Sequence, residues 1–81
     1  MGRKEKTLAA MEANPGGWRY DEVASVLQAF GFIVRKGKGS HRAFSHPRGG
    51  TVMLVEKGHG ALKPYQVEDA ARAIRNSLED V

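Results

Sequence analysis

The stretch FIVRKGKGSHRAFSHPRGGTVMLV, residues 32–55, decides the fold of this chain. Three short segments rich in β-branched and aromatic residues, FIVRK, SHRAFS and TVMLV, are separated by GKG and HPRGG, which are turn compositions. Gly37 and Gly39 tolerate the positive φ that a tight turn can require. The stretch therefore predicts three antiparallel strands joined by two hairpins.

Helical patterns lie on both sides of these strands. In residues 20–31 the apolar side chains recur at helical spacing, and Gly31 is suited to end the helix. In residues 64–78 a second apolar face follows Pro64, a residue favoured at the first helical position. The predicted buried faces consist of Val23, Val26, Leu27 and Phe30 in the first helix, and of Val67, Ala70, Ala71, Ile74 and Leu78 in the second.

The order of these elements predicts an α+β domain with a three-stranded antiparallel sheet. Such a sheet needs one apolar face covered, and we expect both long helices to pack on that face. This is the arrangement of a double-stranded RNA-binding domain (dsRBD), which reads RNA shape, phosphates and 2′-hydroxyls. We assign residues 18–81 to this single domain and residues 1–17 to an N-terminal extension with a short helix over residues 3–13.

Positive charge is concentrated in the middle of the chain, which has a formal net charge of +4. Residues 32–63 hold seven lysines and arginines against Glu56 alone, whereas residues 1–31 balance and residues 64–81 are net acidic. A localised cationic surface suits a phosphate backbone, because each neutralised phosphate releases condensed counterions. A surface that only confers solubility is the alternative interpretation.

Nothing in the sequence directs the chain to a membrane. The longest apolar runs, near residues 29–34 and 52–55, are far shorter than a bilayer span, and the N-terminal segment has no apolar signal region. The chain has no cysteine, which is compatible with the reducing cytoplasm where we place it. We expect a cytoplasmic protein without a membrane partner.

The hairpin RKGKGSHRAFSHP, residues 35–47, combines this charge with a histidine. Strand alternation places His41 with Ala43 on one face and Arg42 with Phe44 on the other, and we expect the His41 face to be open. Imidazole exchanges protons near neutral pH, so His41 can serve RNA cleavage by a 2′-hydroxyl that attacks its own phosphodiester. A histidine that only makes surface hydrogen bonds remains the alternative at this point.

The cations beside His41 fit the phosphate of such a reaction. Lys36, Lys38 and Arg42 are expected to hold the phosphate and to stabilise the charge that develops on it.

Metal-dependent hydrolysis does not fit this hairpin. Magnesium sites need convergent carboxylates, and Glu56 stands alone in the segment. His41 and His46 differ by an odd number, so on a regular strand they face opposite ways and make a poor zinc pair. No acid is placed to orient His41 in a catalytic triad. We therefore expect no metal and no cofactor, and cleavage that survives a chelator.

The segment LQAFGFIVRKGKGSHRAFSHPRGGTVMLV, followed by LKPYQVEDAARAI, resembles the HicA toxins of type II toxin-antitoxin systems, which are small mRNA-cleaving ribonucleases of dsRBD-like fold. The resemblance rests on the helix that ends in FGF, the KGSH hairpin, the HP turn followed by a glycine, and the KPYQV start of the last helix. Together these motifs cover about residues 18–78.

This resemblance implies that His41, in its Gly-Ser-His motif, is the catalytic residue, and that a HicB-type antitoxin encoded beside this gene covers the site. Two positions depart from the family pattern. Many members have a second histidine where this chain has Arg42, and a Pro-x-His segment where this chain has VEKGHGALK, with His59 as a loose counterpart. The residues expected to contact RNA are Arg35, Lys36, Lys38, Gly39, Ser40 and Arg42.

The sequence is compatible with three alternative functions. The first is a metal-independent endoribonuclease toxin that cleaves mRNA with His41 as general acid or base. The second is a dsRBD-like module that binds RNA or DNA without cutting it. The third is a partner-binding domain whose basic face meets an acidic protein.

Overall fold

The computed structural model describes residues 2–56 and 60–78. Its elements follow the predicted order, and α1 and α3 begin and end at the predicted residues. The helices and strands are α1 (Arg3–Ala13), α2 (Tyr20–Ala29), β1 (Ile33–Lys36), β2 (His41–His46), β3 (Gly50–Val55) and α3 (Pro64–Leu78).

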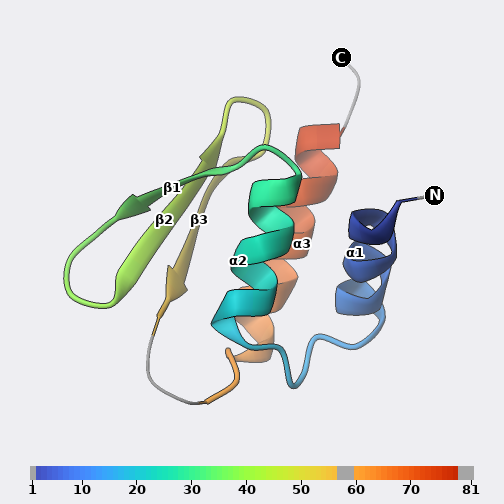
Figure 1. Ribbon diagram of the computed structural model, residues 1–81, viewed down its shortest axis with the longest axis horizontal. Coiled ribbons are helices and arrows are strands. Elements are labelled where there is room, and N and C mark those ends of the chain that lie inside the picture. Colours follow the sequence, from blue (N-terminus) through green and yellow to red (C-terminus); the bar gives the residue numbers. More distant parts are fainter. Residues whose placement is uncertain (1, 57–59, 79–81) are drawn as a thin grey trace.

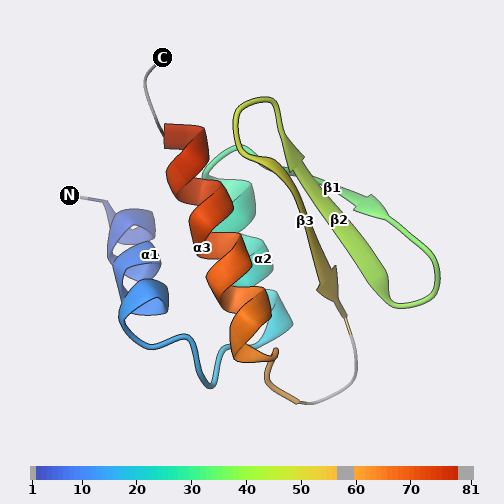
Figure 2. The ribbon, with the colours of Figure 1, turned by 180° about the vertical axis from the view of Figure 1, so that it is seen from behind.

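The three strands form an antiparallel sheet in the order β1-β2-β3. In its register Phe44 of β2 lies opposite Val34 of β1 and Val52 of β3, so these side chains share one face. Both α2 and α3 cover that face, and α1 packs on the far side of the two helices (Figures 1 and 2). The α+β fold with two helices on one face of the sheet is confirmed.

The core lies between the sheet and this helical layer. Phe44 and Leu54 are fully buried from the sheet side, and Leu27 and Ile74 are fully buried from α2 and α3. The opposite face of the sheet is open, because Ile33 is 67% exposed and Met53 is 50% exposed. The predicted alternation, with the His41 face outward, is confirmed.

The junction between α2 and β1 is a Schellman cap. Gly31 has φ +96°, and its N–H donates to the carbonyl of Gln28 at 3.0 Å. The Phe32 N–H reaches back to the carbonyl of Leu27 at 3.0 Å. A residue without Cβ adopts this left-handed conformation at little cost, which explains why the helix stops here and the strand begins.

The N-terminal helix belongs to the same core. Leu8 and Met11 of α1 are buried in the hydrophobic cluster that also contains the sheet residues. The Arg75 guanidinium of α3 donates two hydrogen bonds to the Glu12 carboxylate, at 2.7 and 2.8 Å. Residues 3–13 are therefore joined to the domain by apolar burial and by an ion pair.

Trp18 connects the segments that precede α2 and α3. Its side chain is partly buried against the core, and its carbonyl accepts the Leu62 N–H at 2.7 Å.

Leu78, predicted to lie on the buried face of α3, is 50% exposed because it is in the last turn of the helix. Within the described ranges, no helix has the length and apolar character needed to cross a membrane.

Candidate active site

The β1–β2 hairpin presents His41 at the start of β2. The Gly37 N–H donates to the His41 carbonyl at 2.8 Å, and the His41 N–H donates to the Lys38 carbonyl at 3.0 Å. Of the two hairpin glycines, Gly39 has positive φ, at +61°, and Gly37 does not. Of the two glycines expected to tolerate this conformation, Gly39 therefore adopts it.

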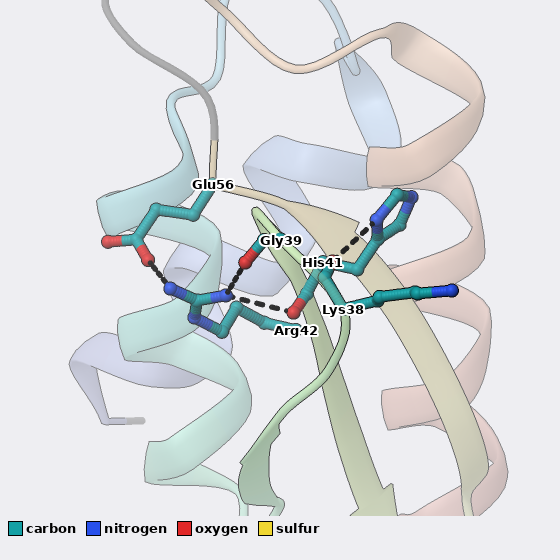
Figure 3. Close-up of polar contacts among 5 residues, drawn as sticks. All are labelled: Lys38, Gly39, His41, Arg42 and Glu56. Atoms are coloured by element: carbon teal, nitrogen blue, oxygen red, sulfur yellow. Dashed lines mark hydrogen bonds and ion pairs between the residues drawn. The ribbon is translucent and has the colours of Figure 1, made fainter.

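A backbone carbonyl orients the His41 ring. Its Nδ1 lies 3.1 Å from the Lys38 carbonyl oxygen (Figure 3). Because a carbonyl can only accept, this hydrogen bond requires the proton on Nδ1. In the neutral ring Nε2 then carries the lone pair. The exposed imidazole is thus held in the tautomer that can accept a proton at Nε2 and, once charged, can donate one from the same atom.

Arg42 lies on the other face of the sheet from its neighbour His41. Its Nη1 donates to the carbonyls of Gly39 and His41, at 3.0 and 2.9 Å, and its Nη2 lies 2.9 Å from Oε1 of Glu56 (Figure 3). The Arg42 side chain is only 18% exposed. Its guanidinium therefore supports the loop that carries His41 and already has a carboxylate partner.

Glu56 also connects the hairpin to the end of β3. Its backbone N–H donates to the carbonyl of Ser40 at 2.7 Å, while its side chain pairs with Arg42. The sequence presents Glu56 only as the single acid in a basic segment. Its contact with Arg42 spans the second hairpin, so it depends on strand register rather than on a local motif.

The predicted cations are divided between the two faces. Arg35 pairs with Ala43 in the register, which places it on the open face with His41, and Lys36 pairs with Arg42 on the opposite face. The Lys38 side chain points to the same side as His41 (Figure 3). Arg35 and Lys38 are therefore the cations best placed beside the imidazole.

The second histidine of β2 has a different environment. His46 is on the face opposite His41, and its ring packs on Phe32 with centroids 5.0 Å apart. Its Nδ1 accepts the Arg48 N–H at 3.0 Å, which stabilises the β2–β3 turn. Among the described residues, no cluster of three histidine, cysteine or acidic side chains could hold a metal ion. His59 lies outside the described residues.

Comparison with known proteins identifies one matching family. The sequence profile of one family, described as "HicA toxin of bacterial toxin-antitoxin", matches residues 20–75, from the start of α2 to near the end of α3. The match covers well over half of the chain and includes the whole sheet and His41. No curated protein and no solved structure matches the chain significantly. The protein belongs to the HicA toxin family of bacterial toxin-antitoxin systems.

Proposed function

We propose that this protein is a metal-independent endoribonuclease that cleaves mRNA, with His41 as the proton-transfer residue. The observation that carries the proposal is the exposed His41 ring, held by the Lys38 carbonyl with Nε2 as its reactive atom, on a basic hairpin. Family membership supports a toxin function, and ribonuclease activity is typical of such toxins.

The proposed reaction uses the RNA's own 2′-hydroxyl as the nucleophile. The 2′-oxygen attacks the adjacent phosphorus, the bond from phosphorus to the 5′-oxygen breaks, and a 2′,3′-cyclic phosphate forms. Neutral His41 accepts the 2′-hydroxyl proton at Nε2, or protonated His41 donates a proton to the leaving 5′-oxygen. Water or a second group completes the other proton transfer.

Hairpin cations and backbone groups are proposed to hold the phosphate. Arg35 and Lys38 share the face of His41, and Lys36 lies near the hairpin tip, so all three can contact the RNA backbone. The N–H groups of the loop at Gly39 and Ser40 border the same tip. We assign Arg42 a positioning role instead, because its guanidinium is bonded to two loop carbonyls and to Glu56.

We further propose a HicB-like antitoxin that covers the open face of the sheet. This face exposes Met53, which pairs with Ala43 two residues from His41, and Ile33, which pairs with Ser45 farther along β2. Exposed apolar side chains on the face that carries a functional group are typical of a surface that another protein covers. The proposed place of action is the cytoplasm, where mRNA is translated. Mixing the product of the adjacent gene with the toxin should inhibit cleavage stoichiometrically.

The test compares wild-type protein with His41→Ala on RNA in the presence of EDTA. The proposal expects cleavage by wild type and loss of about 10²- to 10⁴-fold in the variant, the usual contribution of general acid or base catalysis. Equal cleavage by both proteins, or none by either at high protein concentration, would refute it.

Binding without cleavage is the second candidate function. The cationic hairpin favours it, since cations need only a phosphate partner and no chemistry. It predicts salt-sensitive RNA or DNA binding that is lost when Arg35, Lys36 and Lys38 are replaced by alanine and is unchanged in His41→Ala. An affinity that does not depend on salt would contradict both candidate functions.

A further inference from the structure

A groove of about 530 Å³ lies between β3 and α3, and His41 forms part of its wall. His41 pairs with Val55 at the end of β3, and Tyr65 is the second residue of α3. His41 and Tyr65 therefore lie at the end of the groove where β3 ends and α3 begins. Arg72 and Asn76 line the other end of the groove, toward the β2–β3 turn. The volume is in the range of small-molecule sites and is sufficient for a nucleobase.

The charge of the groove differs from that of the hairpin. Among the described residues that line it, Arg72 is the only lysine or arginine, and it is paired with Asp69 at 3.0 Å. The cations on the His41 side, Arg35 and Lys38, belong to the hairpin instead. The hairpin therefore favours binding of a phosphate backbone, and the groove beyond His41 favours a less charged part of a ligand.

Tyr65 provides a largely exposed aromatic surface in this groove. Its side chain is 58% exposed. The other tyrosine, Tyr20, is partly buried and packs on Phe44 at a centroid distance of 6.1 Å, and burial raises the pKa of its phenol. Tyr20 thus has a structural reason to be aromatic. Tyr65 and Met53, both exposed, line the same groove.

We infer that this groove binds an unpaired base of the RNA next to the scissile phosphate, with Tyr65 as the stacking platform. Aromatic side chains bind bases by stacking in single-stranded RNA, whereas a base inside a duplex is already stacked and cannot enter such a groove. The inference rests on the proposed ribonuclease function and specifies its substrate as single-stranded RNA. Phosphates lie on the Lys38 side of His41, and the base lies on the Tyr65 side.

Binding to catalytically inactive protein tests this inference separately from cleavage. In the His41→Ala background, affinities are measured for a short single-stranded RNA and for a duplex of the same sequence, with Tyr65, Tyr65→Ala and Tyr65→Phe. Loss of stacking is expected to weaken single-strand binding by about 5- to 100-fold in Tyr65→Ala. Tyr65→Phe retains the ring and should bind within about twofold of the parent.

Matched controls separate this effect from a general loss of structure. Ile33→Ala removes a side chain of similar exposure on the open face of the sheet, outside the groove, and should leave single-strand affinity unchanged. Duplex affinity should also be equal with and without the Tyr65 ring. Thermal melts of each variant establish that the fold is intact.

Equal single-strand affinities for Tyr65→Ala and Tyr65→Phe would overturn the inference. An equal loss on single strand and duplex would do so as well. Because these measurements use binding by inactive protein, they decide the role of Tyr65 even if wild type proves unable to cleave RNA.

Discussion

His41 and Arg42 are neighbours in sequence whose side chains lie on opposite faces of β2. The His41 ring is exposed and is oriented by the Lys38 carbonyl, whereas the Arg42 guanidinium is bonded to the carbonyls of Gly39 and His41 and paired with Glu56 (Figure 3). The two residues therefore have different environments. His41 presents its imidazole to solvent, and Arg42 supports the loop that carries His41.

Replacing Arg42 separates a positioning role from a phosphate contact. Arg42→Ala leaves two loop carbonyls without their donor, so we expect kcat for RNA cleavage to fall by about 10- to 100-fold with little change in KM. A direct phosphate contact would instead raise KM and reduce the salt dependence of binding. Steady-state kinetics at several salt concentrations distinguish these results.

Glu56→Gln is the matched variant for the same pair. If Arg42 positions the loop, removal of its carboxylate partner should lower kcat in the same direction as Arg42→Ala. If Arg42 binds RNA, removal of a neighbouring negative charge should tighten RNA binding. Tighter binding with unchanged kcat would contradict the positioning role.

Substitution of Gly39 is expected to destabilise the fold because of the backbone conformation of this residue, and not because a side chain would clash. Its φ is +61°, and a Cβ there would meet nothing within 4 Å. Gly39→Ala should therefore reduce the free energy of unfolding by about 1 kcal/mol. Gly39→Asn should cost less, since asparagine tolerates the left-handed region. Urea denaturation of both variants measures the difference, and an equal loss would contradict this explanation.

Helix α1 should contribute to stability although it lies outside the family match. Leu8 is 1% exposed, so Leu8→Ala is expected to reduce the free energy of unfolding by about 2–5 kcal/mol. Lys6→Ala, at an exposed position of the same helix, is the control and should change stability little. Two unfolding transitions in place of one, with Leu8→Ala affecting only the first, would show that α1 is not part of the cooperative unit.

The Glu12–Arg75 ion pair predicts a pH dependence of stability. The hydrogen bond from Arg75 lowers the pKa of Glu12 below its ordinary value of 4.5. A lowered folded pKa gives stability that is present above pH 4.5 and is lost as the pH falls through the folded value. The difference in melting temperature between wild type and Glu12→Gln should be small at pH 7, because the pair is exposed, and should vanish in acid. A difference that grows toward acid would contradict this sign.

Local patterns in the sequence were sufficient to predict most of the fold. The apolar repeat and Pro64 correctly predicted the bounds of α3, and Gly31 correctly predicted where α2 ends. The segments of period two predicted the bounds of the strands to within one residue. Leu78 departed from its predicted burial because helical periodicity says nothing about where the core ends.

The candidate site was predicted less completely. Strand alternation correctly separated His41 from Arg42, but the partners of both residues come from tertiary structure. Glu56 reaches Arg42 only through the register of β2 and β3, and the Lys38 carbonyl is a backbone group without a sequence signal. The groove that joins His41 to Tyr65 required the packing of α3 beside β3, which no local pattern specifies.

The most direct test of the central claim is the single-turnover cleavage of RNA by wild type and His41→Gln in EDTA, with identification of the product ends. Glutamine retains polarity but cannot transfer the proton. We predict 2′,3′-cyclic phosphate and 5′-hydroxyl ends from wild type, and a rate lower by about 10²- to 10⁴-fold in the variant. Equal rates for the two proteins, or 5′-phosphate ends, would contradict the claim that His41 transfers a proton while the 2′-hydroxyl attacks the phosphodiester.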